Sequence, residues 1–200
     1  MALYGDLKRA KSEEDVKDAY IKALGLKSYS KNLIDIQTKE VWFEAKANGS
    51  STFYEMFTQL LHYVQVALNK GEHVPALLCV IDTEKAALMQ SSHVISFLAK
   101  KTVKWGKSAS SVPKEAVDAI SIHIGTHFVA VNIEKDSSEF ISTVKDAINA
   151  GAIIRTQITP DNLKHVFDKW VDMIGQEVED IRDDKYSLLF FSDIMNHGIS

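Results

Sequence analysis

The sequence predicts a single α/β domain in which helices flank a central mixed β-sheet. Residues 76–81 form a continuous apolar run, which is typical of a strand buried on both faces in the middle of a sheet. Segments with helical periodicity alternate with short β-type runs along the chain. Nine glycines and three prolines in 200 residues, with 46% hydrophobic residues, exclude a disordered or collagen-like chain. We therefore expect residues 1–200 to form one globular domain.

Helices are predicted where apolar residues recur every three to four positions between recognisable caps. Ser12 is an N-cap residue followed by acidic residues, and Gly25 ends that helix. Gly71 ends the second helix, and Pro160 with Asp161 opens the last one. The predicted helices are residues 13–24, 53–69, 137–149 and 161–178.

Short β-type runs supply the strands of the predicted sheet. The first two are separated by a four-residue connection and read as a hairpin. The central apolar run is followed by a turn and a partner strand, and a further pair of strands is predicted around Gly125. The predicted strands are residues 33–36, 41–45, 76–81, 86–89, 120–124 and 128–133.

Three charged residues interrupt the apolar runs of the predicted hairpin. Asp35 lies on its first strand, whereas Glu44 and Lys46 follow on the second, two apart and therefore on one face. Two partly buried carboxylates repel each other, and a divalent cation removes that cost. Carboxylate oxygens suit Mg²⁺, which polarises a phosphodiester and activates a bound water. Lys46 is placed to orient that water and to stabilise charge in the transition state.

The pattern acid-x-Lys is weak by itself, because it occurs four times in the chain. Only the Glu44 copy lies in an apolar β-type run that directly follows a second such run carrying an Asp. Charged residues at positions where a strand requires apolar ones tend to mark functional sites. The context of Glu44, more than the pattern, therefore indicates a site.

The hairpin motif resembles that of the PD-(D/E)xK nuclease superfamily. Leu-Ile-Asp35 is followed by Phe-Glu44-Ala-Lys, after a helix that carries acids, and position 34 is Ile where the motif's name has Pro. The order helix, hairpin, helix, strand matches the superfamily's restriction-endonuclease-like core. The resemblance covers roughly residues 10–90. Residues 91–200 match nothing specific, and we expect them to extend the sheet and add C-terminal helices.

A second motif lies on the helix after the hairpin. Gln59 and Tyr63 resemble the Gln-x-x-x-Tyr motif of the RecB-like branch, and a spacing of four puts them on one helix face. The alternative is that Tyr63 is ordinary core and Gln59 a solvated neighbour. In that family an acid on the first helix supports the metal site. Glu14 is the best match and Glu13 the second, although both could simply complement the helix dipole.

The resemblance implies a Mg²⁺-dependent DNA endonuclease, with Mn²⁺ as a substitute. Within the superfamily the chain most resembles the N-terminal nuclease domains of restriction-modification enzymes, which implies DNA and a methyltransferase or helicase domain or subunit as partners. Cutting both strands with one site per chain favours a homodimer, and the ending at residues 195–200 suggests a chain excised from a longer protein. The implied catalytic residues are Asp35, Glu44, Lys46, Gln59 and Tyr63, and the implied metal ligands are Asp35, Glu44 and Glu14.

Charge is unevenly distributed along the chain, whose net charge is −4. Residues 1–110 carry 15 basic and 12 acidic side chains, whereas residues 111–200 carry 8 and 15. A basic stretch with one tryptophan near residue 104 could contact phosphates and stack on a base. An equally good interpretation is a solvated loop whose tryptophan joins the core. The candidate DNA-binding residues are Lys100, Lys101, Lys104, Trp105 and Lys107.

Other features indicate the class of protein rather than a site. Cys79 is the single cysteine, so no internal disulfide can form, and a reducing cytoplasm is the expected location. No apolar run is long enough to cross a bilayer and the N-terminus lacks a secretory signal, so no membrane association is expected. His123 and His127 are four apart, but Gly125 between them predicts a strand turn without helical metal-ligand spacing.

Two alternatives to a nuclease remain open. The same fold could serve as a non-catalytic DNA-binding or assembly module, because the second half is acidic and no base-reading element is recognisable. The intact set of two acids and a lysine favours catalysis over this alternative. The motif could also match by chance in an unrelated α/β domain.

Overall fold

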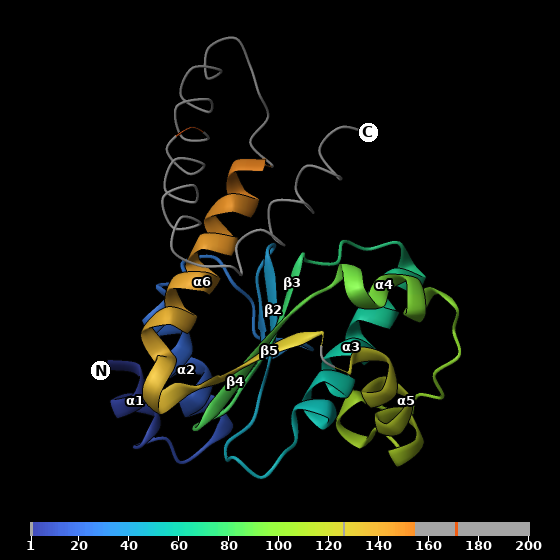
Figure 1. Ribbon diagram of the computed structural model, residues 1–200, viewed down its shortest axis with the longest axis horizontal. Helices are drawn as coiled ribbons and strands as arrows, with labels where there is room; N and C mark the ends of the chain where they lie inside the picture. Colours follow the sequence, from blue (N-terminus) through green and yellow to red (C-terminus); the bar gives the residue numbers. More distant parts are fainter. Residues whose placement is uncertain (1, 126, 155–170, 172–200) are drawn as a thin grey trace. The chain divides into compact units, whose positions relative to one another are not determined.

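The computed structural model describes residues 2–125, 127–154 and 171 (Figure 1). Its contacts divide the chain into two compact units, residues 1–151 and 152–200, and the fold described below is that of the first. Apart from residue 171, the helix predicted at residues 161–178 falls outside the described part of the chain.

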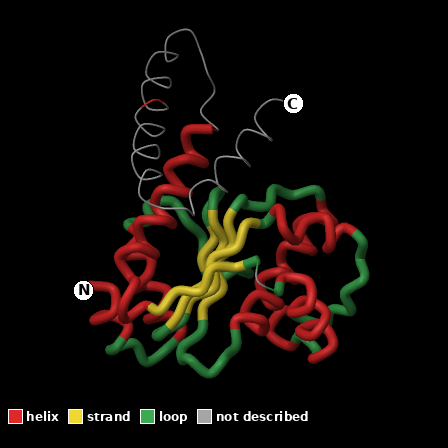
Figure 2. The backbone as a smooth tube through the Cα atoms, in the orientation of Figure 1, coloured by secondary structure: helices red, strands yellow, loops and turns green. Residues whose placement is uncertain are grey.

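A five-stranded mixed sheet forms the centre of this unit (Figure 2). The strands are β1 Ile36–Gln37, β2 Val41–Ala45, β3 Leu77–Ile81, β4 Lys85–Gln90 and β5 Phe128–Asn132. They follow one another across the sheet in chain order, with β2 and β3 parallel and the other neighbouring pairs antiparallel. β3 is the middle strand, as its continuous apolar sequence predicts. The α/β class and the mixed sheet are confirmed.

Helices cover both faces of the sheet (Figure 1). They are α1 Ala2–Leu7, α2 Glu13–Leu24, α3 Phe53–Lys70, α4 Ser92–Ala99, α5 Lys114–Ile124 and α6 Ile133–Ile154, with a 3₁₀ turn, η1, at Ala109–Ser111. One hydrophobic core lies between the sheet and α3, α4 and α5, and a second lies between the sheet and α1, α2 and α6. α3 is also the crossover that the parallel pair β2 and β3 requires. Among the described helices, none has both the length and the hydropathy to span a bilayer.

Strand β2 shows how the two cores share the sheet. Val41, Phe43 and Ala45 are buried in the core beside α2, and Trp42 is buried in the core beside α3. Because side chains alternate along a strand, Glu44 belongs to the α3 face together with Trp42. A carboxylate therefore occupies a buried position where the pattern calls for an apolar side chain.

The predicted caps set the boundaries of α2 and α3. At the start of α2, the Asp15 N–H donates to the Ser12 hydroxyl, and the Asp15 carboxylate accepts from the Ser12 N–H. Gly25 and Gly71 each adopt φ of 67° and end α2 and α3. Because its cap fixes where α2 begins, Glu13 is the first residue of that helix.

The strand predicted at residues 120–124 is wrong, because these residues form the last turns of α5. Ile120 and Ile124 are fully buried, whereas Ile122 between them is 84% exposed. Isoleucines at every second position satisfy the period of a strand, but the first and third also share one face of a helix. β5 consequently pairs with β4 and not with a neighbouring strand across Gly125.

Three further differences concern element boundaries. The first hairpin strand is reduced to β1, so Asp35 comes immediately before the strand instead of lying on it. Helices α1 and α4 have no counterpart in the prediction. The predicted helix at residues 137–149 is confirmed within α6, which begins earlier, at Ile133, and bends at Asp136, where φ is −116° and ψ is 18°.

Candidate catalytic centre

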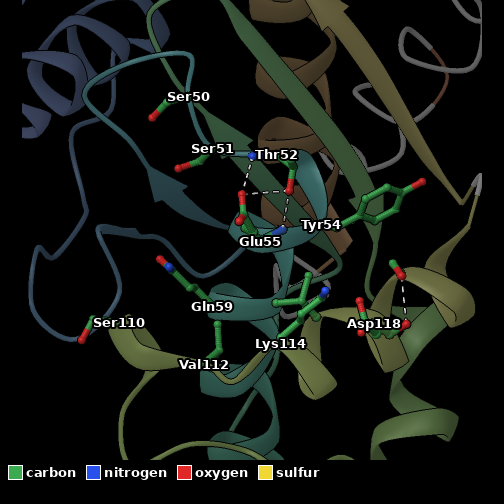
Figure 3. A pocket seen from close by; sticks show the side chains of 12 residues that line it. Ser50, Ser51, Thr52, Tyr54, Glu55, Gln59, Ser110, Val112, Lys114 and Asp118 are labelled. Atoms are coloured by element: carbon green, nitrogen blue, oxygen red, sulfur yellow. Dashed lines mark hydrogen bonds between the residues drawn. The ribbon is translucent and has the colours of Figure 1, made fainter.

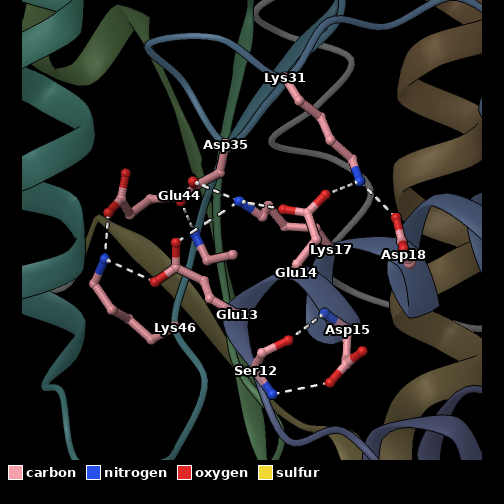
Figure 4. Close-up of polar contacts among 11 residues, drawn as sticks. Ser12, Glu13, Glu14, Asp15, Lys17, Asp18, Lys31, Asp35, Glu44 and Lys46 are labelled. Atoms are coloured by element: carbon pink, nitrogen blue, oxygen red, sulfur yellow. Dashed lines mark hydrogen bonds and ion pairs between the residues drawn. The ribbon is translucent and has the colours of Figure 1, made fainter.

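Acidic side chains from three segments meet beside the C-terminal end of β2 (Figure 4). Glu44 comes from β2, Asp35 precedes β1, and Glu13 begins α2. Ile36 pairs with Phe43 across the hairpin, and continuing this register by one residue sets Asp35 opposite Glu44. We call Glu13, Asp35 and Glu44, with the lysines that they contact, the acidic centre.

Asp35 is anchored by both of its carboxylate oxygens. Its Oδ2 accepts a hydrogen bond from the Ala45 N–H at 2.7 Å, which ties it to the strand that carries Glu44. Its Oδ1 accepts from Lys17 Nζ at 3.3 Å. The backbone bond holds Asp35 beside Glu44 even though Asp35 itself lies outside the regular strand.

Glu44 is the most buried acid of the centre, with 7% of its side chain exposed. Its Oε1 lies 2.5 Å from Lys46 Nζ, two residues further along the chain. The pKa of Glu44 is raised to about 7: burial is the main cause, Lys46 opposes the rise, and the charges of Asp35 and Glu13 add to it. Near neutral pH this carboxyl therefore lacks enough positive charge to be held fully ionised.

Glu13, and not Glu14, faces the other two acids. Its carboxylate lies 3.8 Å from Lys17 Nζ and 3.9 Å from Lys46 Nζ, so it stands between the two ammonium groups. Burial, followed by the neighbouring Asp35 carboxylate, raises the pKa of Glu13. Glu13, the second match to the family's helix acid, therefore occupies the position that was expected for Glu14.

Glu14 lies on the outer side of α2, where 56% of its side chain is exposed. It pairs with Lys17 at 2.9 Å and with Lys31, and hydrogen bonds from Lys31 and then Lys17 lower its pKa. Glu14 therefore reaches the centre only through Lys17.

Lys17 is a member of the centre that the sequence analysis missed. Burial disfavours its charged form, but hydrogen bonds with Glu14 and Asp35 outweigh that effect and raise its pKa. The signal for Lys17 was present, because it follows Glu13 by four residues and therefore shares its helix face. Lys31, which holds Glu14 and Asp18 from a loop, had no comparable signal.

The ion pairs form one continuous network with an excess of negative charge (Figure 4). Five carboxylates face three ammonium groups, which leaves two uncompensated negative charges when all are ionised. The network consists of Glu13, Glu14, Asp18, Asp35 and Glu44 with Lys17, Lys31 and Lys46.

A divalent cation fits the chemistry of this donor set. All donors are carboxylate oxygens, and the excess charge equals that of one Mg²⁺. Burial raises the pKa of Glu44, and a cation beside this carboxylate would oppose that rise. Within residues 2–125 and 127–154, no three acidic, histidine or cysteine side chains converge as ligands of one ion would. The oxygens point instead at Lys17 and Lys46, so a bound cation would require these side chains to turn.

The two residues of the Gln-x-x-x-Tyr motif have different surroundings. Tyr63 faces the acidic centre: burial raises its pKa, and the charges of Glu44 and then Asp35 add to the rise. Gln59 lines a hollow of about 670 Å³ between the start of α3, η1 and α5 (Figure 3). Hydroxyl groups such as that of Ser50 dominate its wall, and no member of the ion-pair network lines it.

The basic stretch after α4 is a loop that leads to η1. Its four lysines, at positions 100, 101, 104 and 107, are exposed, and none forms an ion pair within the described residues. Trp105 is half-buried against the core beside α3, and its ring stacks on His62 with centroids 5.3 Å apart. The tryptophan therefore joins the core, as the alternative interpretation expects, while the lysines remain available to a polyanion.

The two histidines near Gly125 and the single cysteine have surroundings of their own. His123 lies in the last turn of α5, not in a strand turn, and its ring stacks on Phe97 at 3.9 Å. His127 stacks on His93 at 4.9 Å, and the described residues hold no group of three potential ligands at this corner. Cys79 is fully buried, as predicted, and burial raises its pKa far above the usual range of a thiol.

Comparison of the chain with protein-family models, curated proteins and solved structures gives no match. The superfamily resemblance therefore stays a prediction from the motif.

Proposed function

We propose that the protein is a metal-dependent deoxyribonuclease that hydrolyses phosphodiester bonds at the acidic centre. The observation that carries this proposal is the ion-pair network around Glu44, in which one buried and two partly buried carboxylates from three segments outnumber the two ammonium groups that they contact. Stability alone does not favour such an arrangement, because buried like charges repel. A site that takes up a cation during function accounts for it.

Asp35 and Glu44 would hold a Mg²⁺ or Mn²⁺ ion, with Glu13 as the supporting acid in place of Glu14. When bound, such an ion supplies a Lewis acid and lowers the pKa of a coordinated water. Lys46, released from Glu44, would orient the attacking water and stabilise negative charge on the phosphate. Tyr63 keeps its phenolic proton at neutral pH, because its pKa is raised, and can donate it to a phosphate oxygen.

DNA is the proposed substrate, because the exposed lysines of residues 100–107 offer positive charge that no described acid neutralises. Lys100, Lys101, Lys104 and Lys107 would contact the phosphate backbone. We propose further that the chain acts in the cytoplasm as the cleavage domain of a restriction-modification or related system. A methyltransferase or helicase partner would supply specificity, and a homodimer would cut both strands.

Nicking of supercoiled plasmid in Mg²⁺, in Mn²⁺ and in EDTA tests this proposal. We expect nicking in either metal, none in EDTA, and at least about 100-fold less nicking by Glu44→Gln. Glu72→Gln is the matched control, since Glu72 is exposed and pairs with Lys70 outside the network. No metal-dependent nicking, combined with intact DNA binding, would favour the non-catalytic module of the same fold.

A further inference from the structure

The ammonium group of Lys17 lies among three carboxylates. It lies 2.9 Å from a Glu14 oxygen, 3.3 Å from Asp35 Oδ1 and 3.8 Å from a Glu13 oxygen. Only 13% of the side chain is exposed. Three carboxylates from two segments thus surround one positive charge with little access to water.

The same carboxylates connect Lys17 to the place where the proposed metal would bind. Asp35 accepts from Lys17 through one oxygen and lies opposite Glu44, and Glu13 stands between Lys17 and Lys46. In two-metal nucleases and phosphatases, two ions about 4 Å apart share carboxylates in this way. Lys17 therefore stands where a second ion would be expected.

We propose that Lys17 takes the place of a second divalent ion, so that the acidic centre binds one metal ion instead of two. This inference rests on the proposed function, because it concerns the same centre. The charge balance agrees with it: one divalent ion neutralises the two uncompensated charges of the network, whereas a second would leave the network strongly positive. Without Lys17, the network would accommodate a second ion.

Counting bound Mn²⁺ tests the proposal independently of nuclease activity. The full chain is titrated with Mn²⁺ at pH 8, and the free ion is followed by electron paramagnetic resonance. We expect one ion per chain for the wild type and for Lys17→Arg, which keeps the charge. For Lys17→Met, which removes the charge but keeps much of the apolar stem, we expect two.

Lys31→Met is the matched control. This substitution removes one ammonium group from the same network. Like Lys17, the wild-type Lys31 side chain contacts Glu14, but it pairs with neither Asp35 nor Glu13. We expect this variant to bind one ion. Lys17→Gln keeps a hydrogen-bond donor at this position, and we expect it also to bind two ions, so it replaces Lys17→Met if that variant does not fold.

The remaining outcomes contradict either the role of Lys17 or the metal centre itself. One ion in every folded variant, or two ions in the wild type, would overturn the role of Lys17 while leaving a metal centre in place. A second ion in Lys31→Met as well would show that loss of any positive charge suffices, which also overturns the role of Lys17. No ion in the wild type would overturn the proposed metal centre itself.

Discussion

At Glu44, burial disfavours the charged carboxylate and the neighbouring Lys46 favours it. Its side chain is buried on the α3 face of β2, where the neighbouring Trp42 belongs to the hydrophobic core. Lys46 compensates part of its charge, while Asp35 and Glu13 add to the repulsion. The protonation of a carboxyl in these surroundings should be visible in the stability of the protein.

The metal-free protein should lose stability as the pH rises from about 5 to 8. Burial raises the pKa of Glu44 from 4.5 to about 7 in the folded state, so its contribution is complete below pH 4.5 and is lost as the pH passes about 7. The loss should be at most about 3 kcal/mol. Urea unfolding at a series of pH values in EDTA measures it.

Glu44→Gln should flatten most of this decline. Glu13 and Asp82, whose pKa values are raised in the same direction, should contribute to the remainder. Glu72→Gln should leave the decline as it is in the wild type. In the wild type, Mg²⁺ should restore stability at pH 8. An equally steep decline in Glu44→Gln would contradict the assignment of this titration to Glu44.

At the scale of elements, the start of α2 decides which acid enters the centre. The capping box of Ser12 and Asp15 fixes the first turn, and the packing of α2 on the sheet turns Glu13 inward and Glu14 outward. A hydrogen bond from the Ala45 N–H likewise holds the Asp35 carboxylate in the centre. Local capping thus serves the site as well as the helix.

Removal of the cap should therefore cost both stability and metal affinity. Ser12→Ala should lower the free energy of unfolding by about 1 kcal/mol, because it deprives the Asp15 N–H of its acceptor. Loosening of the first turn should also weaken Mn²⁺ binding through Glu13. Thr52→Ala, which breaks the equivalent box of α3, should lower stability similarly without this effect on Mn²⁺.

Ser12→Ala and Thr52→Ala can be compared by urea unfolding and Mn²⁺ titration under the same conditions. Equal Mn²⁺ affinity in both variants would contradict the role assigned to the first turn of α2.

Elements with local signals could be predicted from the sequence, whereas their neighbours in space could not. The caps at Ser12 and Gly25 bound α2 correctly, because a cap depends on residues only a few positions apart. A strand was predicted at residues 120–124 because isoleucines at alternate positions fit a strand. The same isoleucines also fit a helix that buries every fourth residue, which is what these residues form. Periodicity over five residues does not distinguish the two cases.

The same limit applies to the candidate centre. Asp35, Glu44 and Lys46 could be predicted because a hairpin brings them together within twelve positions of the sequence. The choice of Glu13 over Glu14 depends on which side of α2 packs against the sheet, and that side is decided by tertiary contacts. Lys31 enters the network from a loop whose course no local pattern specifies.

At the scale of the whole unit, the acidic and basic features come from different elements. The acidic centre lies beside the end of β2, whereas the exposed lysines of residues 100–107 follow α4. In the proposed function, the lysines would attract the phosphates of DNA, and the acidic centre would need a bound cation before it could accept a phosphate. Binding and cleavage should therefore respond to different substitutions.

The double variant Lys101→Ala, Lys104→Ala should weaken DNA binding without affecting Mn²⁺ binding. Each lost phosphate contact should reduce the slope of log affinity against log salt by about 0.9. The double variant Lys22→Ala, Lys27→Ala removes two lysines near the end of α2 and should leave the slope unchanged. Fluorescence anisotropy with a labelled duplex at several salt concentrations measures both; equal slopes in the two variants would contradict the proposed DNA-binding loop.

The most direct test of the central claim is the initial rate of plasmid nicking by Lys46→Ala, measured in Mg²⁺ at saturating protein. Lys46 contacts Glu44 and Glu13 but contributes little to the core, so its removal should leave the fold and the affinity for DNA nearly unchanged. We predict a rate at least about 100-fold below that of the wild type, with Lys70→Ala as an unaffected control. Equal nicking by Lys46→Ala and the wild type would contradict the assignment of catalysis to this centre.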